Sequence, residues 1–107
     1  MENVTIKQAQ EMIDIFVKER NWQTTETDTV LHIIEELGEI ARNVLKMKNY
    51  GGQHTSNSNI NMDEELGDIL YLILKLSNQT NINLEKAFIN KLEMIRNKYP
   101  LNSSKQQ

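Results

Sequence analysis

Apolar side chains return every three or four residues over most of this chain, which is the spacing of a helix that buries one face. The first such run covers about residues 5–20. Thr5 followed by Gln8 has the pattern of a capping box, in which each side chain binds the other residue's backbone N–H. A polar connection over 21–27 follows and contains the only tryptophan, Trp22. We therefore predict a first helix over about 5–20.

Three further helices are predicted from the same spacing. The second begins near Asp28, a favoured N-cap residue, and fades near 49–52, where two glycines occur. The segment 49–61 is almost wholly polar and predicts a mobile loop. Asn61 caps a third helix that runs to about residue 78, and either Asn81 or Asn83 caps a fourth, which Pro100 ends. We expect one domain over 1–100 and a disordered tail over 101–107.

The third helix is apolar on more than one side. Leu66, Ile69, Ile73 and Leu76 form one face, and Leu70 and Leu74 extend the apolar surface around the helix. A helix that is apolar nearly all round is buried nearly all round, and three partner helices of this size do not provide enough cover. We predict an all-α, four-helix bundle-like protomer completed by oligomerisation, as a homodimer or homotetramer.

Composition narrows the functional classes. Hydrophobic residues make up 38% of the chain and charged residues 25%, which is typical of a globular domain. The net charge of −3 and the lack of a basic cluster argue against nucleic-acid binding. The longest apolar stretch, Ile69 to Leu74, is too short to span a membrane. Absence of cysteine excludes thiolate chemistry, and the first residues lack signal-peptide architecture, so we expect a cytoplasmic protein.

Two acidic segments resemble each other: Glu35-Glu36-Leu37-Gly38-Glu39 and Glu64-Glu65-Leu66-Gly67-Asp68. A glycine inside a helix costs about 1 kcal/mol relative to alanine. Because this cost recurs in the same context, we expect a shared cause, namely close approach of another helix or of a ligand.

Helical geometry then sorts the acids, because each residue turns by about 100° relative to the one before it. Glu36 and Glu39 border an apolar arc centred on Leu37, Ala41 and Val44. Glu65 and Asp68 lie at the edge of the arc on the third helix, so antiparallel packing would bring four carboxylates together. Such a group repels strongly unless it is protonated or binds cations, and all-oxygen ligation suits Mg²⁺ or, in its place, Mn²⁺.

The order and spacing of these acids resemble the EExxE…ExxD pattern of the MazG-like all-α nucleotide pyrophosphohydrolases. Arg20-Asn21-Trp22 before the first motif and Asn97-Lys98-Tyr99-Pro100 at the end resemble flanking parts of that family. The resemblance implies that Glu36, Glu39, Glu65 and Asp68 bind Mg²⁺. It implies hydrolysis of (deoxy)nucleoside triphosphates to a monophosphate and pyrophosphate, with nucleotide-pool housekeeping as the expected role.

Six other residues are candidates for catalysis or substrate binding. Glu35 is the remaining acid of the first motif, and it is a general base, a ligand of a second ion or a solvated side chain. Trp22 is a candidate for stacking on the base or for capping the core. Tyr71 lies about one turn beyond Asp68 and contacts either the nucleotide or a subunit interface. The lysines Lys75, Lys91 and Lys98 are candidates for phosphate contact, with an ordinary surface role as the alternative.

Two rival interpretations remain. A ferritin-like di-iron bundle requires Glu-x-x-His on two helices, whereas Glu39 and Asp68 occupy the corresponding positions. A non-enzymatic helical interaction or regulatory module would instead use the acids as a solvated face, and it would lack a metal site supported by all four.

Overall fold

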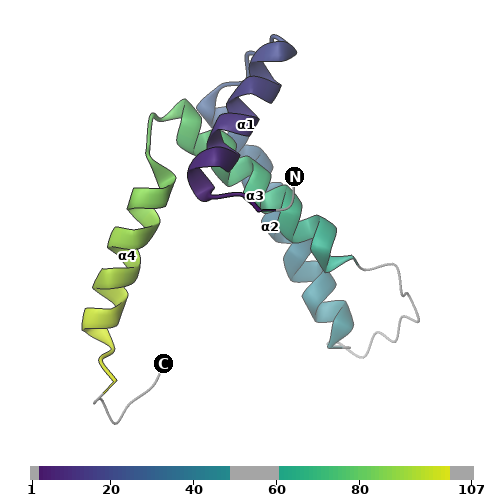
Figure 1. Ribbon diagram of the computed structural model, residues 1–107. Coiled ribbons are helices and arrows are strands. Elements are labelled where there is room, and N and C mark those ends of the chain that lie inside the picture. The colour runs from purple at the N-terminus through teal and green to yellow at the C-terminus, as the bar shows by residue number, and fades with distance from the viewer. Residues whose placement is uncertain (1–2, 49–60, 102–107) are drawn as a thin grey trace.

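The computed structural model describes residues 3–48 and 61–101, and over these ranges it consists of helices without strands (Figure 1). The helices are α1 (Ile6–Glu19), α2 (Glu26–Met47), α3 (Met62–Gln79) and α4 (Leu84–Lys98). The predicted all-α class is therefore confirmed. None of these described helices is long and apolar enough to cross a membrane. The predicted loop lies outside the described residues except at Asn61, as does the predicted tail beyond Leu101.

Side-chain caps define where the helices begin. Thr5 and Gln8 form the predicted capping box, with hydrogen bonds of 3.0 Å from the Gln8 N–H to Thr5 Oγ1 and 2.8 Å from the Thr5 N–H to Gln8 Oε1. The second helix begins at Glu26, close to the predicted start near Asp28, but the predicted N-cap is wrong. Thr25 is the N-cap of α2, and Asp28 stands three residues further on as the acceptor in a second capping box. Both residue types cap helices, and only the reciprocal pair satisfies two backbone N–H groups at once.

The two later helices begin at asparagines. Asn61 accepts a hydrogen bond from the Glu64 N–H at the start of α3, as predicted. Of the two candidates for α4, Asn83 is the cap, since its Oδ1 accepts from the Lys86 N–H. Asn81 instead takes a left-handed conformation with φ of 57° in the turn between α3 and α4.

The helices are arranged around an antiparallel hairpin of α2 and α3 (Figure 1). α1 packs against α3, while α4 meets α1 and extends away from the hairpin. Gln10 of α1 holds the turn that sets this direction. Its Nε2 donates to Ser77 Oγ and to the Ile82 carbonyl, each at 2.8 Å, and its Oε1 accepts from the Leu84 N–H at 3.1 Å. The side chain thereby ties α1 to both ends of the α3–α4 connection.

The core of the described protomer is small. Leu72 and Leu74 are the only hydrophobic side chains in these ranges that are classed as buried, at 2% and 5% exposure. Within the protomer, Leu66 and Ile73 of the predicted apolar face are 53% and 37% exposed, whereas Ile69 and Leu76 are half-buried. Leu74 also packs inside the protomer rather than extending its surface. Since α3 has apolar residues on several sides, its periodicity alone does not specify which side meets α1 and α2.

Candidate metal centre

Three carboxylates from two helices meet in the α2–α3 hairpin. Glu65 and Asp68 are one helical turn apart on α3, and Glu36 reaches them from α2. One carboxylate oxygen of each residue lies within 4.8 Å of the corresponding oxygens of the other two. Residues i and i+3 share a helix face, so the spacing in α3 presents both acids to the antiparallel α2.

The acids of this cluster differ in burial. The Glu36 side chain is only 13% exposed, Glu65 is half-buried and Asp68 is exposed. One oxygen of Glu36 and one of Glu65 are buried and accept no hydrogen bond from any described residue. An acceptor left without a partner away from water is costly, which indicates that these oxygens have a partner not supplied by the described protein groups.

Burial and mutual repulsion perturb the titration of the cluster. Burial raises the pKa of Glu36 above its ordinary value of 4.5, and neighbouring negative charges raise it further. These charges are those of Glu39, Asp68 and Glu65. His32, whose Nε2 lies 3.7 Å from Glu36 Oε2, acts in the opposite direction. The ionised form of Glu36 is therefore disfavoured in the metal-free protein.

Glu65 shows the same pattern. Burial raises the pKa of Glu65 first, the charges of Glu39, Asp68 and Glu64 add to the effect, and Arg42 lowers it. A divalent cation would offset both the repulsion and the missing hydrogen bonds. The donor set is all oxygen, so these residues fit Mg²⁺ or Mn²⁺ rather than zinc.

The two remaining acids of the first motif lie outside the close group. Glu39 is exposed, although its charge acts on both Glu36 and Glu65. Glu35 is also exposed and lines a shallow surface depression with Asp28 and His32. The structure thus brings together three of the four predicted ligands and leaves the predicted catalytic residue beside them on α2.

The position of Glu36 corrects the predicted arc on the second helix. That arc is centred on Leu37, Ala41 and Val44, of which Leu37 is 52% exposed and Ala41 is also exposed, whereas Val44 is half-buried. The more covered stripe of α2 instead contains Ile33, Glu36, Ile40 and Asn43. Glu36 thus lies within the face that meets α3 and not at its border, because α2 has apolar residues on two sides and only one packs inside the protomer.

The two helix glycines do not mark a close helix contact within the protomer. A Cβ atom added at Gly38 or Gly67 would have no atom of another described helix within 4 Å. That part of the prediction is wrong for the protomer, and a ligand or a second subunit remains as the cause of the repeated glycine.

Beyond the acids along α3, a lysine lies among aromatic side chains. Lys75 is 8% exposed, and its Nζ donates to Thr24 Oγ1 at 3.1 Å. The same Nζ is 5.6 Å from the ring centroid of Trp22 and 6.0 Å from that of Tyr71. Burial raises the pKa of Tyr71, and Arg20 opposes that rise. Lys75 is thus a nearly buried side chain and not the surface lysine of the alternative interpretation.

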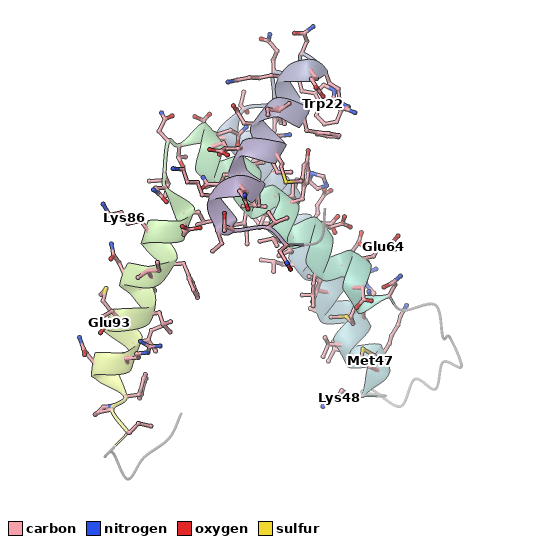
Figure 2. All side chains as sticks on the ribbon, viewed as in Figure 1. Trp22, Met47, Lys48, Glu64, Lys86 and Glu93 are labelled. Atoms are coloured by element: carbon pink, nitrogen blue, oxygen red, sulfur yellow. The ribbon has the colours of Figure 1, made fainter. Side chains whose placement is uncertain are left out.

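Trp22 lies beside α1 and is partly packed and partly exposed. It is 47% exposed and meets Phe16 edge to face, with ring centroids 5.5 Å apart and an interplanar angle of 81°. Figure 2 shows Trp22 at the opposite end of the hairpin from Glu64 and Met47. A large part of the indole is therefore open to a ligand.

The other two candidate lysines lie elsewhere. Lys91 and Lys98 are exposed on α4, which packs on α1, and the structure does not bring them to the acids of this protomer. Sequence reasoning missed Thr24, the partner of Lys75, because a threonine in a polar connection carries no pattern. It also missed Gln10, whose hydrogen bonds outside α1 join it to residues at least 67 positions away.

Comparisons with known proteins bear on the family and the fold. The model of the MazG nucleotide pyrophosphohydrolase domain matches residues 23–100. The crystal structure of YpjD from Bacillus subtilis, described as a proposed pyrophosphatase, is similar to this chain with a TM-score of 0.70 and 27% sequence identity. The alignment covers 96% of this chain and 100% of that one. A search of curated proteins found no match.

Proposed function

We propose that this chain, which belongs to the MazG nucleotide pyrophosphohydrolase family, hydrolyses (deoxy)nucleoside triphosphates to a monophosphate and pyrophosphate with Mg²⁺ as cofactor. Family membership itself implies a pyrophosphohydrolase. The substrate, the metal and a housekeeping role in the cytoplasm are our proposal. The observation that carries it is the cluster of Glu36, Glu65 and Asp68, with two buried carboxylate oxygens that have no hydrogen-bond partner in the described part of the chain.

The residues of the cluster take distinct roles in this proposal. Glu36, Glu65 and Asp68 hold the cation, and exposed Glu39 completes the set when substrate binds. When bound, Mg²⁺ supplies charge compensation for phosphate oxygens and activation of water. Glu35, next to this set on α2, accepts the proton of the attacking water. The burial of Glu36 keeps bulk water from its carboxylate and strengthens its hold on the cation.

A second copy of the chain is part of the proposed active unit. The two helices of the hairpin carry large apolar side chains that are between 37% and 59% exposed: Val30, Ile34, Leu37, Leu45, Leu66, Leu70 and Ile73. A patch of this kind across two helices is typical of a protein interface. Both helix glycines are open to the outside, so another backbone has room to approach them.

This interface has a direct test. Replacing Leu66 and Leu70 with Glu should convert the oligomer to monomer in sedimentation velocity, because two charges enter an apolar contact. Leu74→Glu is the contrasting variant, since Leu74 is 5% exposed in the protomer and its replacement should lower the melting midpoint itself. A well-folded wild-type monomer at micromolar concentration would refute the oligomer.

The proposed reaction is tested with a panel of ribo- and deoxynucleoside triphosphates, scored separately for pyrophosphate and orthophosphate. We expect pyrophosphate and a monophosphate in equal amounts, and activity that disappears with a chelator and returns with Mg²⁺. Orthophosphate as the first product would contradict the assignment. A protein that binds no Mg²⁺ and releases neither product would support the rival interaction module.

A further inference from the structure

Of the lysines in the described ranges, Lys75 is the one whose surroundings indicate a bound ligand. Its side chain is 8% exposed, and the described residues form no ion pair with it. An ammonium group has three N–H donors, and among residues 3–48 and 61–101 one hydrogen bond is made, toward Thr24 Oγ1. A nearly buried charge with one neutral partner is costly, and such costs are found where a ligand supplies the missing acceptors.

The aromatic neighbours of Lys75 indicate which part of a nucleotide would approach. The ammonium lies near both the Trp22 and the Tyr71 rings, and Trp22 is 47% exposed. Exposed aromatic faces bind nucleobases by stacking, and they offer little to a phosphate group. A base that rests on the exposed part of Trp22 would therefore lie close to Lys75.

The distance from the acids agrees with this assignment. Asp68 and Lys75 are seven residues apart on α3, and a rise of 1.5 Å per residue separates them by about 10 Å along the helix axis. This is comparable with the span of a nucleotide from its phosphates to its base. A triphosphate at the acids would thus place its base near Lys75.

We infer that Lys75 is a specificity-determining residue, which donates a hydrogen bond to a carbonyl oxygen of the base and so selects keto bases over amino bases. The inference rests on the proposed function and deepens it. Uracil and thymine have a carbonyl at position 4 and guanine one at position 6, where cytosine and adenine carry amino groups that donate. Because an ammonium cannot accept a hydrogen bond, an amino group facing it leaves two donors opposed.

The test compares substrates that differ at this exocyclic group and in the protonation of the ring nitrogen next to it. Wild-type kcat/KM should be at least about tenfold higher for dUTP than for dCTP, and for dITP than for dATP, as expected for one charged hydrogen bond. Lys75→Met keeps the length of the stem and removes the donor, so both ratios should fall toward one, mainly through the keto substrates. Lys86→Met, an exposed lysine on α4, is the matched control and should retain both ratios.

Two further variants keep the test decisive if Lys75→Met melts at a lower temperature. Lys75→Arg preserves a donor and should retain part of the keto preference. Thr24→Val removes the partner that positions Nζ and should reduce the preference without removing the charge. A wild type without keto preference would overturn the inference. So would a Lys75→Met variant that lowers kcat/KM equally for all four nucleotides, because that result would make Lys75 a phosphate contact.

Binding is measured separately from hydrolysis through the intrinsic fluorescence of Trp22, the only tryptophan. Quenching by dUMP that exceeds quenching by dCMP, and that loses this difference in Lys75→Met, would support the inference even if no pyrophosphate were released. In that case the proposed reaction would be refuted, and the assignment of Lys75 to a base-binding site would be supported. Pyrophosphate release with equal quenching by the two monophosphates would support the reaction and overturn the role of Lys75.

Discussion

Replacing Glu36 with Gln tests the metal centre at its most buried ligand. The change keeps the shape of a side chain that is 13% exposed and removes one of the three charges that lie within 4.8 Å of one another. Two like charges at this separation repel by about 1 kcal/mol in water. Because Asp68 is exposed, the value for water is the appropriate one for its repulsion of Glu36. Without metal, the variant should therefore melt at the wild-type temperature or up to about 5 °C above it.

With Mg²⁺ present, the wild type should instead melt at a higher temperature than Glu36→Gln. A ligand present at 100 times its dissociation constant stabilises the folded state by about 2.7 kcal/mol, which raises the melting midpoint of a domain of this size by about 10 °C. Weakening the site about 100-fold, as expected when a ligand is lost, would leave about 0.4 kcal/mol at the same Mg²⁺ concentration. The variant should thus show a shift of about 2 °C.

The assay is a set of thermal melts with and without Mg²⁺, paired with pyrophosphate release. Glu93→Gln is the matched control, because it makes the same chemical change at an exposed acid of α4 whose side chain is 64% exposed. Its Mg²⁺ shift and its turnover should equal those of the wild type. The reasoning would be refuted by a Glu36→Gln protein with the full wild-type shift, or by a wild type that does not respond to Mg²⁺.

Three further results are expected. Because the folded-state pKa of Glu36 is raised above 4.5, the group's contribution to stability is most favourable below that pH and declines as pH rises through the raised pKa. In metal-free melts between pH 4 and 8, the stability of Glu36→Gln relative to wild type should therefore increase with pH, and a constant difference would contradict the cause assigned here. Gly67→Ala should stabilise an isolated protomer by up to about 1 kcal/mol, since the added Cβ meets open space, and should weaken the oligomer in sedimentation equilibrium. Unchanged association would remove Gly67 from the proposed interface. Glu35→Gln should lower kcat by about 10²-fold or more while retaining the Mg²⁺ shift, whereas loss of that shift would make Glu35 a metal ligand and wild-type kcat would make it a solvated acid.

Local properties of the sequence were sufficient to predict the helices and to select the candidate acids. Helical spacing, capping residues and Pro100 predicted four helices, because caps and periodicity depend on residues within one or two turns. The spacing of Glu65 and Asp68 likewise places both on one side of α3 whatever packs against it. The exception among the helix starts is α2, where two capping residue types stand three positions apart and the box they form together decides the boundary.

Tertiary structure decided which side of each helix faces inward. α2 and α3 both carry apolar residues on more than one side, so periodicity left several packing phases open, and the hairpin places Glu36 and Leu72 inside while Leu37 and Leu66 are exposed. The contact of Lys75 with Thr24 joins residues 51 positions apart and has no local signature. A sequence pattern shows which residues share a side of one helix. Which side packs against which neighbour depends on how all the helices fit together.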